Sequence, residues 1–367
     1  MSLDGPSSGG QPDGAGTITA VIVSYDTEPD EIRATLDSLL AQTRAPAEIL
    51  IVDNGAGGPI ARELRGYAAE LRTIASGANL GYNAAVNLAA ANSNCDYLLC
   101  LNPDARAEAG CIEQLASVSD ADATIALAGA QILLEDGLTR NAGANPLHPT
   151  GISPSGGYGE PREQGPPRDV AVVSGACCLM RRASLLALGG LVEELFLYYD
   201  DVDLAWRARI AGMRVVYCPA AVVRHDYEFA RRGRKWFFLE RNRVFGVLSN
   251  YEARTLILLS PLLVVCEIGL LAVATRSGWL KQKLASYGSL LALRRRLLSQ
   301  RRAVKASRQR TDVELLELFT DRLDSALLSA RATALANAVC VPYLLVLRRL
   351  LRPASPGLRP SGRAAQD

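Results

Sequence analysis

Apolar runs and helical spacings alternate along most of the first 225 residues. Residues 17–26 (TITAVIVSYD) form a continuous apolar run bounded by turn residues, which is typical of a strand buried in a parallel sheet. In residues 29–43, apolar side chains recur at helical spacing behind Pro29, so we expect a helix there. The same patterns predict a helix at 83–93 and further strands at 48–58, 71–77, 96–104, 127–134, 170–182 and 213–226. Because strands and helices alternate, we expect an α/β fold with a mostly parallel sheet flanked by helices.

Polar residues stand where several of these predicted strands end. Asp26 ends the first run, Asp53 the second, and Asn102 and Asp104 the run at 96–104. Open α/β sheets bind ligands at this carboxyl edge. Each residue alone is compatible with a turn or a helix cap. Three such groups on one sheet edge indicate a ligand site.

The stretch YYDDVDLAWR, residues 198–207, places three Asp residues after an apolar run. Asp residues at a helix start cap free backbone N–H groups and suit the helix dipole. Asp203 and Arg207 would then be an ordinary structural pair four residues apart. The alternative is that one of these carboxylates is a catalytic base. The stretch alone leaves both interpretations open.

Composition narrows the class of protein. The 367 residues are 49% hydrophobic and 21% charged, which is typical of a globular chain long enough for a large domain and an appendage. The eight Cys residues contain no CxxC pair, so zinc chemistry is not indicated, and free thiols suit a reducing cytosol. We expect Cys177 and Cys178 to fill a buried strand as small apolar residues. Residues 1–16 lack the pattern of a signal peptide and, like residues 352–367, have the composition of a disordered segment.

Residues 141–169 are rich in Gly and Pro. A loop of this length inside a compact domain is usually functional or disordered. We expect a mobile lid or substrate loop, with a passive insertion as the alternative.

The chain becomes basic and apolar in residues 231–351, where we expect a helical region. Residues 255–274 have the roughly 20-residue length that spans a bilayer, and a second apolar stretch lies at 335–347. Pro261 and Glu267 argue against a simple span, because a charged side chain is costly at the bilayer centre.

Basic residues accompany these apolar stretches. Residues 276–310 contain eleven Arg and Lys and no Asp or Glu. We therefore expect this region to associate with the cytoplasmic face of the cell membrane, as a peripheral or monotopic protein. The alternative is a packed helical hairpin with a basic, solvated face. Nucleic acid is not an expected partner, since no recognisable binding module accompanies the charge.

Several motifs occur together in one order: VIVSYD, LDSLLAQT, ILIVDNG, NLGYNAAVN, LLCLNPDA and VSGACCLMRR, followed by GG and YYDDVDLAWR. In this order and spacing they resemble the family 2 glycosyltransferases of the GT-A fold, in the bacterial branch with rhamnosyl- and galactofuranosyltransferases. The resemblance covers about residues 17–225 and extends more loosely to about residue 302. It implies a GT-A glycosyltransferase domain at 17–230.

The resemblance implies a donor site and a metal site at the carboxyl edge. LNPD resembles the family's metal-binding motif, with Asn102 in place of its first Asp, and His225 aligns with a family His near the metal. Asp104 and His225 are then ligands of one divalent cation, Mg²⁺ or Mn²⁺, which donor phosphates and water complete. The implied donor-binding residues are Tyr25, Asp26, Asp53, Asn79, Gly81, Asn87, Asn102 and Asp104.

The segment YYDDVDLAWR resembles the family's Glu-Asp-x-Asp-Leu-x-x-Arg motif. Asp201 matches the catalytic Asp and would take the proton of the acceptor hydroxyl. Asp200 replaces the Glu and would orient the acceptor. The family's GGFDE appears here as GGLVEE, residues 189–194. The implied acceptor-binding residues are Ser174, Gly175, Ala176 and Asp200.

The expected function is an inverting, metal-dependent transfer of a sugar from a nucleotide-diphosphate donor, linked to dTDP or UDP. L-Rhamnose is the sugar that the resemblance favours, followed by galactofuranose. The expected acceptor is a hydroxyl of a polyprenyl-linked glycan in cell-wall or surface-polysaccharide synthesis.

Two alternatives stay open. A nucleotidyltransferase needs a Gly-rich loop with Lys or Arg after the first strand, which VSYDTEPDEI lacks. A non-catalytic membrane scaffold with a degenerate transferase domain would explain Asn102 and GGLVEE. The joint presence of Asp104, Asp201 and His225 argues against it.

Overall fold

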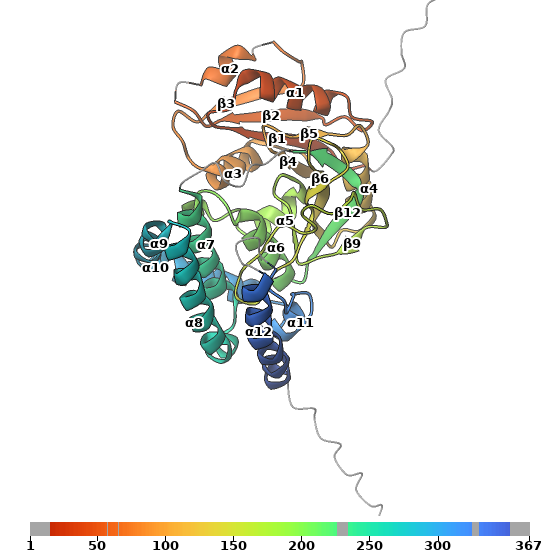
Figure 1. The fold of residues 1–367 in the computed structure, drawn as a ribbon. Helices are drawn as coiled ribbons and strands as arrows, with labels where there is room; N and C mark the ends of the chain where they lie inside the picture. Colours follow the sequence, from red (N-terminus) through yellow and green to blue (C-terminus); the bar gives the residue numbers. More distant parts are fainter. Residues whose placement is uncertain (1–14, 57, 65, 226–233, 325–329, 353–367) are drawn as a thin grey trace, which may run out of the picture.

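The computed structural model describes residues 15–56, 58–64, 66–225, 234–324 and 330–352. They form an α/β part followed by a helical part (Figure 1). Of the two segments expected to be disordered, 1–16 and 352–367, all but positions 15, 16 and 352 lie outside the described residues.

One sheet runs through the α/β part in the strand order β3-β2-β1-β4-β11-β6-β12-β5. Strands β3, β2, β1 and β4 are parallel neighbours, and β6 is parallel to β12, whereas β11 is antiparallel to both β4 and β6. The prediction of a mostly parallel sheet is confirmed. The strands are β1 Ile18–Ser24, β2 Glu48–Asp53, β3 Leu71–Ala75, β4 Tyr97–Leu101, β5 Arg106–Ala107, β6 Ile125–Leu133, β11 Cys177–Arg181 and β12 Arg214–Arg224.

Each apolar run that predicts a strand contains one. The run at 170–182 contains two, because β10 pairs with β8 in a separate two-stranded sheet before the chain enters the main sheet as β11. Cys177 and Cys178 are buried in β11 as expected. The shorter strands are β7 Arg140–Ala142, β8 Ala144–Asn145, β9 Arg168–Asp169 and β10 Val172–Val173.

Helices cover both faces of the sheet. Helices α1, α2 and α4 contribute to one buried apolar cluster, and α3, α5 and α6 to another on the opposite face. These helices and the short 3-10 turn η1 are α1 Pro29–Leu40, α2 Pro59–Glu63, α3 Tyr82–Asn92, α4 Cys111–Ala121, α5 Arg182–Ala187, η1 Glu193–Leu195 and α6 Asp200–Ile210.

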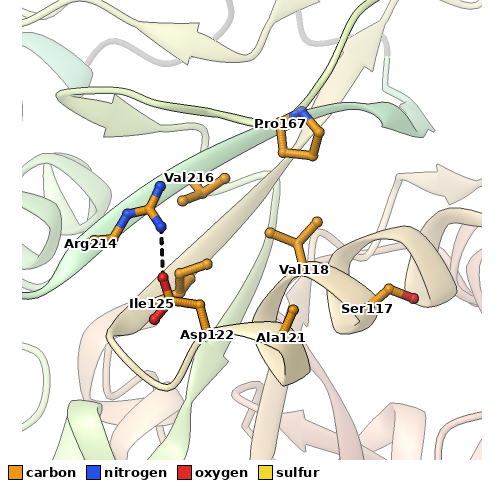
Figure 2. A pocket seen from close by; sticks show the side chains of 8 residues that line it. All are labelled: Ser117, Val118, Ala121, Asp122, Ile125, Pro167, Arg214 and Val216. Carbon is orange, nitrogen blue, oxygen red and sulfur yellow. Dashed lines mark hydrogen bonds and ion pairs between the residues drawn. The ribbon is translucent and has the colours of Figure 1, made fainter.

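A shallow hollow lies at the amino-terminal edge of the sheet, where β6 and β12 begin (Figure 2). Val118 of α4 and Val216 of β12 line it, and Arg214 forms an ion pair with Asp122 there at 2.6 Å. This edge is opposite to the one at which the sequence predicts a ligand site.

Residues 141–169 pack partly into the interior. Leu147, His148 and Thr150 are buried. Arg243 of the helical part donates a hydrogen bond to the Thr150 carbonyl oxygen at 2.9 Å. The predicted mobility of the loop stays a prediction.

The helical part packs on the α/β part through α7, α10 and α11, which all contact α6. Helices α8 and α12 lie antiparallel, since the Tyr343 hydroxyl donates to Leu258 O and Arg254 donates to Leu350 O. Both are long and apolar enough to cross a membrane by length and composition. The helices are α7 Lys235–Asn250, α8 Ala253–Arg276, α9 Leu280–Ala292, α10 Arg294–Ser307, α11 Asp312–Leu316 and α12 Ala330–Leu351.

Glu267, the acid in the middle of α8, belongs to a cluster of charges between α7, α8 and α9. Lys283 is fully buried and forms ion pairs with both Glu267 (2.7 Å) and Glu240. Arg243 pairs with Glu240 at 2.9 Å and also with Glu267. Two acids and two bases therefore neutralise one another, and one side of α8 faces protein.

Candidate active site

The ends of three strands assemble the predicted metal motif. β4 ends at Leu101, and Asn102 donates its backbone N–H to Ala176 O (3.0 Å), just before β11 begins. β12 pairs antiparallel with β5, so its end brings His225 to the turn that holds Asp104. His225 Nε2 lies 3.1 Å from Asp104 Oδ1 and 3.4 Å from Asn102 Nδ2. The fold thus brings these polar side chains to one point of the carboxyl edge.

Asp104 and His225 fit as two ligands of one divalent cation. The Asp104 side chain is 46% exposed, whereas the His225 side chain is 4% exposed, so solvent reaches the pair from the carboxylate side. A carboxylate oxygen with an imidazole nitrogen suits Mn²⁺, and Mg²⁺ keeps several waters besides a few protein oxygens. Within the described residues, no three or more His, Cys, Asp or Glu side chains group into a metal site. A cation here needs further ligands such as phosphate and water.

Asp200 and Asp201 begin α6 and face the residues that precede β11. Asp201 Oδ2 accepts a hydrogen bond from Gly175 N at 3.1 Å. A Cβ atom at Gly175 would lie 3.5 Å from Asp200 Oδ2 and 3.4 Å from Asp201 Cβ, so any larger residue here would be in contact with both side chains. The neighbouring Ser174 is buried, and its Oγ accepts from Ala176 N at 3.3 Å. The predicted acceptor residues and the predicted base are therefore brought together.

Burial raises the pKa of both carboxyl groups. The pKa of Asp200 is raised to about 7 by burial and then by the charge of Asp201. Burial also raises the pKa of Asp201, but hydrogen bonds from Gly175 N and Val202 N oppose that rise. Such a pair shares a proton near neutral pH, and the carboxyl group whose pKa is raised to about 7 holds that proton. We therefore assign the negative charge to Asp201 and the proton to Asp200.

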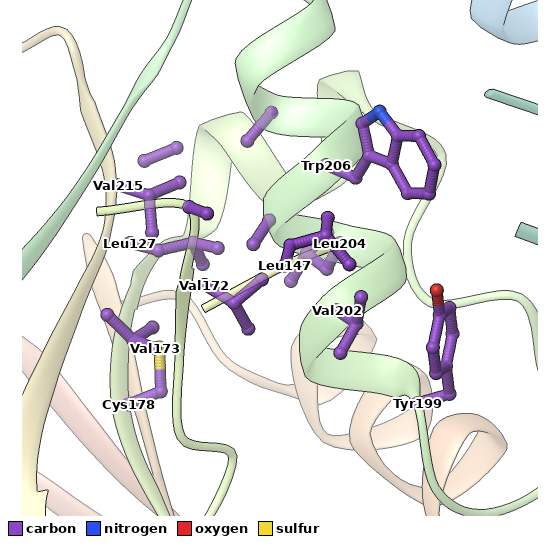
Figure 3. Close-up of a cluster of buried hydrophobic side chains, with 14 of the residues drawn as sticks. Leu127, Leu147, Val172, Val173, Cys178, Tyr199, Val202, Leu204, Trp206 and Val215 are labelled. Carbon is purple, nitrogen blue, oxygen red and sulfur yellow. The ribbon is translucent and has the colours of Figure 1, made fainter. Parts of the chain in front are cut away.

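Helix α6 is held in place by its buried apolar side chains and by the predicted Asp203–Arg207 pair. Val202, Leu204 and Trp206 enter the buried cluster (Figure 3). Arg207 Nε donates to Asp203 Oδ2 at 2.8 Å, and both side chains are buried. The structural pair is confirmed. The Arg207 guanidinium also donates to two carbonyl oxygens of the preceding Gly-Gly turn, those of Leu188 and Gly190.

Comparisons with known proteins agree with this geometry. Residues 19–189 match the family described as Glycosyl transferase family 2, and residues 164–246 match Glycosyltransferase like family 2. N-acetylglucosaminyl-diphospho-decaprenol L-rhamnosyltransferase of Mycobacterium tuberculosis is 30% identical in an alignment of 237 residues that covers 57% of this chain and 75% of that protein. The chain belongs to glycosyltransferase family 2.

This family 2 glycosyltransferase transfers a sugar in glycan or polysaccharide biosynthesis. It is also similar to the low-salt glycan biosynthesis hexosyltransferase Agl10 of Haloferax volcanii, at 24% identity over 57% of this chain and 67% of that protein. Its fold resembles that of GalNAc-T7, crystallised with UDP, GalNAc and Mn²⁺. The TM-score is 0.56, at 15% identity over 66% of this chain and 49% of that one. The predicted GT-A fold and family are confirmed.

Three of the residues predicted to bind the donor lie at the ends of β1 and β2. Tyr25 is 42% exposed, and Asp26 has a left-handed backbone, with φ at 52°. Asp53 is almost fully buried, and its carboxylate accepts hydrogen bonds from Gly55 N (3.2 Å) and Ala61 N (3.1 Å). The Asp53 side chain thus holds the turn after β2. The donor contacts of these residues stay predictions.

The predicted NLGY segment forms a tight turn against Asn54. Asn54 Oδ1 accepts from Leu80 N at 2.9 Å, and its Nδ2 lies 3.2 Å from Asn79 Oδ1. Gly81 has φ at 83°, and a Cβ atom there would lie 2.5 Å from the Phe196 ring, so only glycine fits. The turn thereby packs directly on the segment that leads into α6.

Asn87, on α3, faces residues 189–194, which precede the segment that leads into α6. Its Nδ2 donates to Leu191 O (2.9 Å) and Glu193 Oε1 (3.0 Å), and its Oδ1 accepts from Leu191 N (2.9 Å). Asn87 therefore anchors residues 189–194 to α3. The predicted donor contact of Asn87 stays a prediction.

Tyr82 lies near the predicted acid Asp200, and the sequence alone did not single it out. Burial, with Cys100 and the charge of Asp200 nearby, raises its pKa well above the usual value for tyrosine. Tyr82 is thus close to the carboxylate pair and keeps its proton. Its position inside the NLGY motif is the signal that could have identified it.

Proposed function

We propose that this glycosyltransferase moves L-rhamnose from a nucleoside diphosphate to a hydroxyl of a lipid-linked glycan, with inversion at the anomeric carbon. The observation that carries the proposal is the chain of hydrogen bonds that connects the predicted base, Asp201, to the predicted metal ligands, Asp104 and His225. Asp201 is hydrogen-bonded to Gly175, and the neighbouring Ala176 accepts a hydrogen bond from Asn102, in the turn where Asp104 meets His225. The mycobacterial relative is named for L-rhamnose and a decaprenol-linked substrate, which supports this sugar and acceptor class.

In the proposed reaction, Asp201 takes the proton of the acceptor hydroxyl. The acceptor oxygen bonds to the anomeric carbon as the bond from that carbon to the donor diphosphate breaks. Asp200, which holds a proton near neutral pH, donates a hydrogen bond to an acceptor oxygen. A divalent cation on Asp104 and His225 supplies positive charge for the leaving diphosphate when it is bound. Attack from the face opposite the diphosphate inverts the anomeric carbon.

The donor test uses thermal unfolding of the full chain with dTDP-rhamnose, UDP-galactofuranose, UDP-glucose or GDP-mannose, each with Mg²⁺, Mn²⁺ or EDTA. A ligand at 100 times its Kd stabilises the folded state by about 2.7 kcal/mol, which is visible in Tm. Stabilisation by dTDP-rhamnose that requires metal is the expected result. A shift only with another sugar nucleotide reassigns the donor. No shift with any of them, in a folded protein, contradicts the proposal.

We further propose that the enzyme sits on the cytoplasmic face of the cell membrane as a peripheral or monotopic protein. Apolar side chains on α8 and α12 are exposed, and the two helices pack side by side. The basic helix α10 follows in the same part of the chain and suits anionic headgroups. The exposed apolar residues are Ile257, Val264, Val265 and Ile268 on α8, with Leu335, Val339, Leu345, Val346 and Leu350 on α12.

A further inference from the structure

The segment that leads into the carboxylate pair has an uncommon backbone. Phe196, Tyr198 and Tyr199 all have left-handed φ angles, at 68°, 64° and 69°. Bulky aromatic residues disfavour this conformation, so it persists only when surrounding groups hold it. Asp200 follows immediately, so the direction of both carboxylates depends on this segment.

Asn242, on α7, holds the segment through its backbone. Its side chain is fully buried, and its Nδ2 donates to the carbonyl oxygens of Leu195 (3.0 Å), Leu197 (3.0 Å) and Tyr198 (2.8 Å). An amide nitrogen carries two hydrogens, so one hydrogen is shared between two carbonyls. Asn242 Oδ1 accepts from Arg241 Nε at 2.9 Å, which fixes the orientation of the amide.

Neighbouring contacts reinforce the same conformation. Arg241 donates to Glu194 O (2.9 Å) and Leu195 O (2.7 Å). The Phe196 ring stacks on Phe238 of α7, with ring centroids 5.3 Å apart. These contacts come from α7, which lies beyond residue 230 in the region expected to associate with the membrane.

The other side of the segment meets the donor side. Asn83 N donates to Phe196 O at 3.3 Å, and the Phe196 ring occupies the space beside Gly81. The segment 195–199 therefore lies between the NLGY turn and α7, and it continues into Asp200 and Asp201.

We propose that Asn242 is a positioning residue for sugar transfer, which holds 195–199 in the backbone conformation that directs Asp201 at the acceptor hydroxyl. The proposal rests on the proposed function, since it takes Asp201 as the base. Asn242 touches neither donor nor acceptor in this role. A side chain that served only general stability would change Tm without a selective effect on turnover.

The first experiment compares Asn242→Ala with Asn250→Ala. Asn250 is a fully buried Asn on the same helix that accepts a hydrogen bond from its neighbour Ser249 and, within the described residues, forms no hydrogen bond with 195–199, so it is the control. We expect Asn242→Ala to lower kcat at least tenfold, with donor Kd within twofold of wild type. Asn250→Ala should leave kcat within twofold. A folded Asn242→Ala enzyme with wild-type kcat overturns the proposal.

A rescue experiment tests the conformational cause. Glycine adopts left-handed φ angles freely, so Tyr198→Gly should recover at least part of kcat in the Asn242→Ala background, with Tyr198→Gly alone as reference. Absence of any recovery, with Tyr198→Gly alone active, contradicts the conformational role. If Asn242→Ala does not fold, Asn242→Ser replaces it, because its hydroxyl retains one donor for one carbonyl.

Hydrogen exchange separates failure of this proposal from failure of the proposed function. Amide exchange in 195–203 should be at least tenfold faster in Asn242→Ala than in wild type and Asn250→Ala. Unchanged exchange overturns the positioning role. If the wild-type protein transfers no sugar from any donor, but amide exchange in 195–203 is still faster in Asn242→Ala, the proposed function is wrong. The conclusion that Asn242 holds the backbone of 195–199 is then unaffected.

Discussion

At the scale of single residues, Asp201 differs from Asp200 in the hydrogen bond that its carboxylate accepts from Gly175 N, a group outside its own helix. Asp201→Asn keeps the size of the side chain and removes the base. We expect kcat to fall by about 10² to 10⁴, the range typical of general base catalysis. Donor Kd, measured by calorimetry, should stay within twofold. Near-wild-type turnover in Asp201→Asn would show that another group takes the proton.

Asp104 should determine the metal dependence of donor binding. Asp104→Ala removes the exposed carboxylate of the proposed cation site and leaves His225 in place. We expect donor affinity in Mn²⁺ to fall at least tenfold, while affinity in EDTA stays unchanged. Asp30→Ala, at an exposed acid on α1, is the control. An unaltered response to Mn²⁺ in Asp104→Ala would rule out this ligand.

Asp200 should lower the stability of the fold above neutral pH. Its pKa rises from an ordinary 3.8 to about 7 on folding, so its stabilising contribution is complete below about pH 4 and is lost as pH rises through about 7. Asp200→Asn should therefore raise the free energy of unfolding by about 2 kcal/mol at pH 8, and by much less at pH 4. Urea unfolding at both pH values measures this difference. A variant less stable than wild type at pH 8 would contradict the raised pKa.

At the scale of elements, α6 positions its acids because the rest of the helix is locked in the core. Arg207 is buried, pairs with Asp203 and bonds the carbonyls of Leu188 and Gly190. Arg207→Ala leaves a buried carboxylate without its partner, which should cost about 3–5 kcal/mol of unfolding free energy.

A matched pair on α1 provides the control for Arg207→Ala. Arg33 pairs with Asp30, which is 93% exposed, so Arg33→Ala should cost less than about 1 kcal/mol. Chemical denaturation of both variants gives the two values. If both variants lost the same unfolding free energy, burial of the Asp203–Arg207 pair would not increase its contribution to stability.

The sequence predicts the central strands of this sheet well because helices cover both faces, which makes strands such as β1, β4 and β6 continuously apolar. Periodicity carries no information on strand direction, so the antiparallel placement of β11 between β4 and β6 could not be predicted. Motif order led to Asp104 and His225, which the fold brings together. Asn242 carries no sequence signal, because its role depends on three carbonyl oxygens that only the fold places around it.

At the scale of the whole molecule, α8 and α12 have exposed apolar faces. Point mutations on these faces can test whether the full chain binds membranes. Val264 and Ile268 are exposed, so replacing both with Glu should leave Tm nearly unchanged. We expect binding to vesicles with 30% anionic lipid to fall at least tenfold, measured by flotation, because the charges disfavour burial in the lipid interface. Leu138→Glu, an exposed leucine in the α/β part, is the control. Equal flotation of the double variant and wild type would reject this surface.

The charge cluster around Glu267 also bears on the order of events during synthesis. Arg243 precedes Glu267 in the chain, whereas Lys283 follows it. When α8 leaves the ribosome, only one of the two cations that neutralise its acid and the neighbouring Glu240 exists. Until α9 is made, the nascent helix is an apolar segment whose acid is incompletely paired. Pairing with Lys283 then completes the neutralisation of Glu267 and Glu240, so α8 reaches its final electrostatic environment only after α9 has been synthesised.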